Sequence, residues 1–174
     1  KSVFEAGRKK VTYRQFSADV NALAAVLQKE FNIQKGDRVA LFLNNDIAFP
    51  LIFFAAASIG AVSVPINTRF VSKEIAYILN DSGAKVCVLH PEYKNDCLRA
   101  KESSPSLKHL IMAGSQENGD EGYSLWGLLE PPHEKPDQEE VSEADLASIF
   151  YTSGTTGHPK GALCTHRNLV AASL

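Results

Sequence analysis

Four short apolar runs, separated by segments of helical periodicity, constrain the fold of this chain most strongly. The runs cover residues 38–43, 61–66, 85–89 and 109–112, and they consist mostly of Val, Ile, Leu and Ala. Strands that are buried on both faces are continuously apolar in this way, because helices cover both sides of a parallel sheet. The sequence therefore predicts an α/β fold with a largely parallel sheet and helices on both faces.

Helix signals lie before the first run and between the third and fourth runs. Thr12 followed by Gln15 has the form of a capping box, which predicts a helix start. Apolar residues then recur at helical spacing, which predicts a buried face: Phe16, Val20, Leu23, Ala24 and Leu27. A second helical segment covers residues 92–101.

Capping residues also mark the ends of the two helices that are expected between the first three runs. Asn44, Asn45 and Asp46 are helix-capping residue types, and they precede an apolar helix that Gly60 should end. Ser72 is expected to cap a helix over residues 73–80, followed by the break at Gly83. The carboxylates of Asp46, Glu74 and Asp81 are interpreted as caps or as parts of solvated faces.

The periodic pattern divides the chain into three parts. Residues 1–112 form an α/β unit, and residues 146–174 give a strand, a loop, a second strand and the start of a helix. Between them, residues 113–145 lack periodicity and contain the proline-rich and acidic stretch 131–140. Such a stretch is typical of an exposed connector.

A long uncharged segment within the α/β unit could instead be interpreted as a transmembrane helix. Residues 47–68 contain no charged side chain and are long enough for a transmembrane helix. Pro50, Gly60 and Pro65 divide the segment, however. A buried helix followed by a buried strand explains it better than a membrane span does.

Composition is that of a soluble globular protein, with 44% hydrophobic and 22% charged residues. The formal net charge of -2 gives no support for a nucleic-acid partner.

Cys87, Cys97 and Cys164 lack metal-binding spacing, and we expect them to be buried free thiols in a reducing compartment. The cytoplasm is therefore the expected location. An organelle lumen is the alternative, because the sequence does not begin with Met and a leader could be missing.

A loop rich in glycine and hydroxyl residues follows the apolar run 146–150. Glycines let a backbone approach a ligand closely, and a nest of N–H groups with hydroxyls and one ammonium suits an oligophosphate. The predicted phosphate-binding residues are Thr152, Ser153, Gly154, Thr155, Thr156, Gly157, Lys160 and Gly161. Tyr151 is expected to pack at the strand end and His158 to be exposed.

The spacing within this loop excludes two common phosphate-binding loops. A Walker A loop requires Ser or Thr after the lysine, whereas Gly161 follows Lys160 here. The dinucleotide fingerprint fails because two threonines separate Gly154 from Gly157. A merely solvated Ser/Thr/Gly loop is the alternative interpretation.

Residues 151–161 closely resemble the signature loop of the acyl-adenylate-forming (AMP-binding) family, and the resemblance is strongest to an acyl-CoA synthetase. Residues 162–169 resemble the strand and helix start that follow that loop, and residues 36–40 and 60–67 extend the similarity. The resemblance implies that the chain is part of the large N-terminal domain of such an enzyme. The mobile C-terminal domain and its main catalytic lysine are expected beyond residue 174.

The resemblance also implies substrates. A family member activates a carboxylic acid with ATP and Mg²⁺, releases pyrophosphate, and transfers the acyl group from AMP to coenzyme A, as in fatty acid metabolism. His166 matches a family position near the acyl substrate, with a helix cap or surface histidine as the alternative. No carboxylate is assigned to the metal, and the fragment alone is expected to be inactive. The other candidates are an adenylation domain of a peptide synthetase and a non-ligase ATP-binding module, either a phosphotransferase or a nucleotide sensor.

Overall fold

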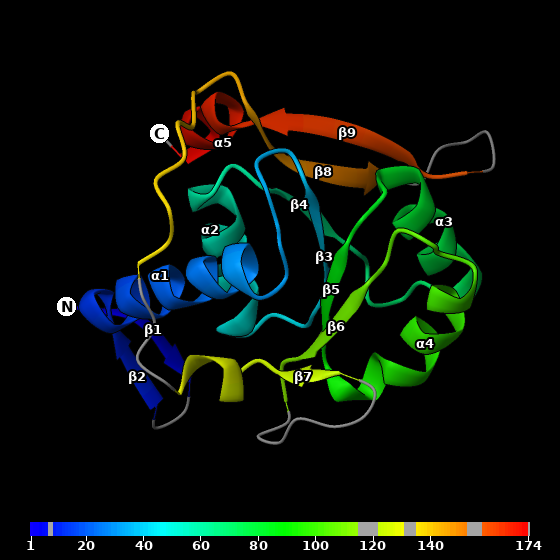
Figure 1. The fold of residues 1–174 in the computed structure, drawn as a ribbon, viewed down its shortest axis with the longest axis horizontal. Coiled ribbons are helices and arrows are strands. Elements are labelled where there is room, and N and C mark those ends of the chain that lie inside the picture. Colours follow the sequence, from blue (N-terminus) through cyan, green and yellow to red (C-terminus); the bar gives the residue numbers. More distant parts are fainter. Residues whose placement is uncertain (7–8, 115–121, 131–134, 153–157, 174) are drawn as a thin grey trace.

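A seven-stranded sheet with the strand order β7-β6-β5-β3-β4-β8-β9 organises the protein (Figure 1). The computed structural model describes residues 1–6, 9–114, 122–130, 135–152 and 158–173. The strands of this sheet are β3 (Arg38–Phe42), β4 (Val62–Pro65), β5 (Val86–Leu89), β6 (His109–Met112), β7 (Tyr123–Ser124), β8 (Leu146–Thr152) and β9 (Lys160–Thr165). Neighbouring strands from β7 to β8 are parallel, and only β8 and β9 pair antiparallel.

Helices cover both faces of the sheet, as the continuous apolar runs predicted. One face packs against α1 (Tyr13–Lys29) and α2 (Ala48–Ser58), and the other packs against α3 (Ser72–Ser82) and α4 (Lys94–Glu102). Side chains of a strand point alternately to opposite faces. In β3, Leu41 therefore joins the core under α1 and α2, whereas Phe42 joins the core under α3 and α4.

The predicted helix boundaries are confirmed at three places. Gln15 N–H donates to Thr12 Oγ1 at 3.2 Å, and Gln15 Oε1 accepts from Thr12 N–H at 3.1 Å, which completes the capping box. Gly60 and Gly83 follow α2 and α3 with φ values of 69° and 64°. Glycine adopts this left-handed conformation without the steric penalty of a Cβ atom, so both residues end their helices sharply.

The prediction that Ser72 caps α3 is wrong. Helix α3 begins at Ser72 itself, and extended Val71 occupies the cap position. Glu74 accepts the Val71 N–H at 3.0 Å, while the Ser72 hydroxyl donates to Asp96 of α4 at 2.7 Å. The hydroxyl thus joins two helices because the packing of α3 on α4 brings a carboxylate within its reach.

Some elements were not expected from the sequence. β1 (Ser2–Ala6) and β2 (Lys9–Thr12) form a separate antiparallel pair, and the 3₁₀ turn η1 (Pro91–Tyr93) precedes α4. The segment 113–145 contributes β7 and the 3₁₀ turn η2 (Gly127–Leu129) to the fold. Leu125 and Leu128 are buried there, and Trp126 Nε1 donates to the carbonyl of Ala113 at 2.7 Å. This part of the segment is thus packed against the core.

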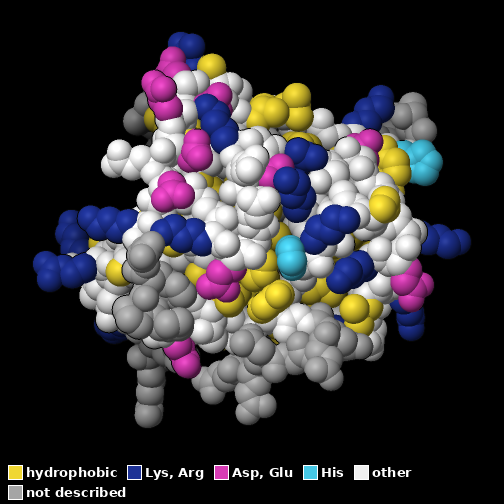
Figure 2. Space-filling model, in the orientation of Figure 1, with side chains coloured by type: hydrophobic (Ala, Val, Ile, Leu, Met, Phe, Trp, Pro, Cys, Tyr) yellow, Lys and Arg dark blue, Asp and Glu magenta, His cyan; other side chains and the backbone are white. Residues whose placement is uncertain are grey.

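The uncharged segment 47–68 folds as a buried helix and strand. Helix α2 ends at Ser58, and β4 pairs with β3 and β8 inside the sheet. No helix in the described parts of the chain is long and apolar enough to cross a bilayer. Charged and apolar side chains are interspersed over the face shown in Figure 2.

The cysteines of the described chain are unpaired. Cys87 and Cys97 are buried, as predicted, and their sulfur atoms lie 3.7 Å apart. Cys164 is only partly buried. The first two thiols fill the core between β5 and α4.

Candidate phosphate-binding hairpin and edge crevice

The β8–β9 hairpin presents Thr152 and Lys160 at the end that carries its loop. These two residues are paired partners in the antiparallel register, and both are exposed. The predicted phosphate-binding residues Ser153, Gly154, Thr155, Thr156 and Gly157 lie outside the described residues. The structure thus places the two ends of the predicted loop side by side.

Gly161 lets the hairpin close tightly. A Cβ atom at this position would lie 2.8 Å from Cγ2 of Ile149 and 3.3 Å from Cζ of Tyr151. Contacts as short as the first do not occur between real Cβ atoms and their neighbours, so a larger residue would push β9 away from β8. Gly161 therefore has a packing role in addition to the predicted one.

Helix α3 supports the hairpin through two contacts. The hydroxyl of Tyr151 donates to Oδ2 of Asp81 at 2.6 Å. The ring of Tyr77 stacks on that of His158, with centroids 4.8 Å apart and an angle of 18° between the planes. Burial and then the Asp81 carboxylate raise the pKa of Tyr151 well above its usual value, so the hydroxyl stays protonated and remains a donor.

These contacts refine the predictions for this region. Tyr151 packs at the strand end and His158 is exposed, as predicted. Asp81 is exposed, as expected of a solvated face, and it also anchors Tyr151, which was not predicted. Glu74 and Asp46 each accept a backbone N–H at a helix start, although Val71 and Ile47 occupy the cap positions; Asp46 accepts the N–H of Ala48 at 2.9 Å. No local pattern distinguishes Asp81 from the other two, because its partner is 70 residues away.

A crevice opens at the carboxyl edge of the parallel strands, next to this hairpin. It has a volume of about 330 Å³ and is lined mainly by residues that follow β3 and β4 and by the end of β8: Leu43, Asn45, Phe49, Pro65, Ile66, Asn67, Thr68, Phe150 and Tyr151. The chain leaves β3 toward α2 on one face and leaves β4 toward α3 on the other. Open α/β sheets bind ligands at such a switch point, beyond the carboxyl ends of the strands.

A polar network fixes the turn that follows β3. The N–H of Asn44 donates to Nδ1 of His90 at 3.0 Å, so the ring hydrogen must reside on Nε2, which lies 2.8 Å from Oδ2 of Asp46. Asn44 also donates to Glu92 at 2.7 Å and accepts from Tyr93 at 2.7 Å. The hydrogen bond from Asn44 lowers the pKa of Glu92. The network holds the polar end of β3 beside the crevice.

His166 lies away from the loop end of the hairpin. It follows β9, whereas Lys160 begins it, and a strand of 6 residues separates the two by about 20 Å. The N–H of His166 donates to the carbonyl of Asp145 at 3.0 Å. Its Nε2 is buried and lacks a hydrogen-bond partner among the described residues. The structure therefore does not bring His166 together with Thr152 and Lys160, the predicted phosphate-binding residues at the ends of the loop.

A metal site cannot be built from the described residues. Within them, no group of three or more His, Cys, Asp or Glu side chains is arranged to hold an ion.

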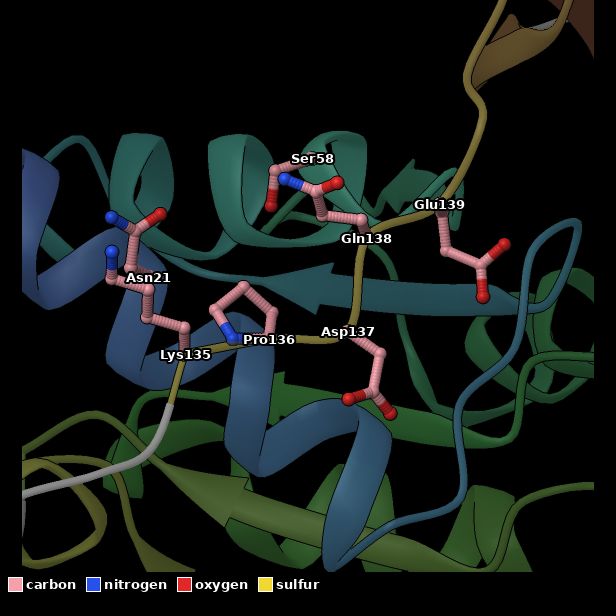
Figure 3. A pocket seen from close by; sticks show the side chains of 7 residues that line it. All are labelled: Asn21, Ser58, Lys135, Pro136, Asp137, Gln138 and Glu139. Carbon is pink, nitrogen blue, oxygen red and sulfur yellow. The ribbon is translucent and has the colours of Figure 1, made fainter.

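Another hollow lies on the face of the sheet that α1 and α2 cover. Figure 3 shows residues 135–139 crossing these helices, with Asn21 and Ser58 at the walls. The hollow has a volume of about 460 Å³. Gln28 fastens this crossing, because it exchanges hydrogen bonds of 2.9 and 3.3 Å with the backbone of Asp137. The crossing ties the end of the segment 113–145 to α1.

The sheet, the crevice at its switch point and the adjoining hairpin define an α/β ligand-binding domain. The family model described as AMP-binding enzyme matches residues 1–174. The chain belongs to this family, which confirms the resemblance that the sequence indicated.

Relatives and solved structures agree with this assignment. The chain is 38% identical over 166 residues to the long-chain-fatty-acid–CoA ligase FadD13 of Mycobacterium tuberculosis, which covers 94% of this chain and 31% of that protein. It is 37% identical to the crotonobetaine/carnitine–CoA ligase of Salmonella paratyphi A, with 91% and 31% covered. The chain thus spans about a third of the length of these relatives.

The fold is that of solved CoA ligases. The anthranilate CoA ligase AuaEII, in complex with anthranoyl-AMP, superposes with a TM-score of 0.89 at 28% identity over 96% of this chain and 32% of that one. The Mycobacterium tuberculosis fatty acyl CoA synthetase gives a TM-score of 0.76 at 38% identity, with 91% and 30% covered. The predicted α/β class, with its largely parallel sheet, is confirmed.

Proposed function

We propose that the chain is the N-terminal part of an ATP-dependent carboxylic acid–CoA ligase. In the first step, a carboxylate oxygen attacks the α-phosphorus of ATP, and the bond to the β-phosphate breaks to release pyrophosphate. In the second step, the thiolate of coenzyme A attacks the acyl carbon of the adenylate, and AMP leaves. The family membership and the named activities of the relatives support this proposal.

The observation that carries the proposal is the position of the hairpin end. Thr152 and Lys160 lie opposite each other at the carboxyl edge of the sheet, beside the switch-point crevice. The ammonium of Lys160 would hold the β- and γ-phosphates and stabilise the charge that develops on departing pyrophosphate. The hydroxyls of Thr152, Ser153, Thr155 and Thr156 and the loop N–H groups would hold the remaining phosphate oxygens.

Helix α3 supports this role by holding the hairpin at both strands. Phosphoryl chemistry depends on fixed donors, because misplaced donors do not stabilise the developing charge. Tyr151 is anchored on β8 by Asp81, and His158 stacks on Tyr77 just before β9. We infer that these contacts set the position of the loop between them.

His166 is proposed as a residue near the acyl substrate. Its buried and unpartnered Nε2 among the described residues is available for another group. The relatives act on chemically different acids, including fatty acids and carnitine derivatives, so the acid of this enzyme is left open. Buried free thiols at Cys87 and Cys97 support a cytoplasmic location.

The proposal requires residues beyond this chain for activity. The family resemblance places the main catalytic lysine in a C-terminal domain, after residue 174. The isolated chain should therefore form no acyl-adenylate at a useful rate, and clear adenylate formation by residues 1–174 alone would refute this inference.

Carboxylate-dependent exchange of labelled pyrophosphate into ATP by the whole protein tests the proposed function. The acids would include acetate, medium- and long-chain fatty acids, aryl acids and amino acids. Exchange with one class establishes adenylation and identifies the substrate class, and AMP release on adding coenzyme A establishes the second step. Acyl transfer only to a carrier protein would indicate a peptide-synthetase domain. ADP release, or binding without turnover, would indicate a phosphotransferase or a sensor.

A further inference from the structure

Three cationic residues stand side by side at the amino edge of the sheet, opposite the hairpin loop. Arg38 begins β3, while Lys85 and Lys108 immediately precede β5 and β6. The N–H of Lys85 donates to the carbonyl of Arg38 at 3.0 Å, and the N–H of Lys108 donates to the carbonyl of Lys85 at 2.8 Å. We call these three residues the cationic row.

The cationic row is costly to the fold by itself. Neighbouring strands lie about 4.8 Å apart, and like charges placed on adjacent strands destabilise a sheet. Lys85 is paired with a carboxylate, that of Asp37 at 2.6 Å. Arg38 donates to the carbonyls of Gly36, Ser82 and Gly83, and Lys108 donates to that of Pro105 at 2.8 Å. Carbonyl partners hold these two cations in place but do not neutralise their charge.

The cationic row lines a hollow of about 500 Å³. Its other lining residues are Phe31, Asn32, Gly83, Ser106 and His109, and none of the lining residues described is acidic. A neighbouring hollow of about 340 Å³ shares Lys108 and His109 and adds Lys101. In Figure 2, dark-blue side chains gather at the middle of the view, over β5 and β6. The surroundings are therefore positive as well as concave.

Two further groups in this hollow suit an anionic ligand with an apolar part. The hydroxyl of Ser106 is buried and has no partner among the described residues. The rings of Phe31 and His109 lie 4.9 Å apart and give the hollow an aromatic wall. Burial, followed by the charges of Lys101 and Lys108, lowers the pKa of His109, which keeps its ring uncharged near neutral pH.

We propose that this hollow binds a small free organophosphate, with its phosphate on the cationic row and its apolar part against Phe31. Arg38 and Lys85 each have a structural role, because Arg38 satisfies carbonyls at the end of α3 and Lys85 pairs with the Asp37 carboxylate. The side chain of Lys108 is exposed, and its ammonium donates to a loop carbonyl, that of Pro105, rather than to a helix end or a carboxylate. The site lies at the opposite edge of the sheet from Thr152 and Lys160. It is therefore independent of the proposed ligase chemistry.

Phenyl phosphate is the probe, because it combines a phosphate with an aromatic ring. The imidazole NMR signals of the whole protein are followed during titration at constant ionic strength, and the His109 signal is assigned by its loss in His109→Gln. The expected result is a saturable shift of that signal, with a lower Kd for phenyl phosphate than for inorganic phosphate. Because the readout is local, binding of the probe at the hairpin does not produce it.

Lys108→Gln should weaken phenyl phosphate binding about tenfold, since a charge-assisted hydrogen bond is lost. Lys101→Gln should weaken it less, and Lys108→Arg should retain it. Lys73→Gln, an exposed lysine on α3, is the matched control and should leave Kd unchanged. A non-saturating drift of the His109 signal, or equal Kd values for Lys108→Gln and Lys73→Gln, would overturn the proposal. Pyrophosphate exchange should be unaffected by Lys108→Gln, so the two proposals fail separately.

Discussion

Replacing Tyr151 with Phe removes a single hydroxyl from the anchor between β8 and α3. The hydroxyl donates to the Asp81 carboxylate at 2.6 Å, and hydrogen bonds to charged groups contribute about 1.5–3 kcal/mol. Asp81 is exposed, so water can replace the lost donor, and the ring still packs against the core under α3. We therefore expect the free energy of unfolding to fall by about 1 kcal/mol, below the full value of such a bond.

The same substitution should change the pH dependence of stability. Burial and the Asp81 carboxylate raise the pKa of Tyr151 in the folded state above its unfolded value near 10. Above about pH 10, the unfolded chain loses this proton more readily than the folded chain does. The stabilisation is complete below the unfolded pKa and is lost as pH rises toward the folded pKa. The difference between the native protein and Tyr151→Phe should therefore shrink above about pH 10.

Urea unfolding of the 174-residue chain, followed by circular dichroism at neutral pH and at about pH 10.5, measures both effects. Tyr77→Phe is the matched control, because it also removes a phenolic hydroxyl while keeping the ring that stacks on His158. This control should leave stability nearly unchanged. Equal stability of Tyr151→Phe and the native chain at neutral pH, or a difference that does not shrink at high pH, would refute the reasoning.

Three other experiments test the site and the core. Lys160→Ala should reduce pyrophosphate exchange more than Thr152→Ala does, because charge-assisted hydrogen bonds are roughly twice as strong as neutral ones; unchanged kinetics for Lys160→Ala would contradict the assignment. Gly161→Ala should destabilise the chain by about 1–3 kcal/mol in urea unfolding, because its Cβ would lie 2.8 Å from a side chain of β8. Ile75→Ala should cost about 2–5 kcal/mol, since the side chain is fully buried, whereas exposed Val71→Ala should cost under about 0.5 kcal/mol; equal costs would refute the burial argument.

Features set by neighbouring residues could be predicted from the sequence. The four apolar runs became parallel strands because only burial on both faces explains such continuity. The capping box at Thr12 and Gln15 and the glycine at position 60 act within one helical turn, so their effect is visible in a few residues. The family loop at the hairpin was likewise a contiguous pattern, and comparison with known proteins confirmed the family.

Contacts between distant segments could not be predicted in the same way. Asp81 meets Tyr151, and His90 meets Asp46, only because the strand order brings their elements together. The local pattern alone predicted that Ser72 caps α3. Its hydroxyl instead donates to Asp96 of α4, a partner in another helix. The short β7 was missed because two residues carry no detectable alternation.

The place of β8 in the sheet also bears on how the protein folds during synthesis. β8 lies beside β4, and Ser148 donates to the carbonyl of Ser63 across a separation of 85 residues. A ribosome delivers the chain from its amino end, so β3, β4, β5 and β6 emerge well before β8 does. Until then, β4 is an open sheet edge with unpaired backbone groups, and such edges can pair with other chains. The hairpin that carries Lys160 thus also closes a sheet edge that would otherwise be open to misassembly in the nascent protein.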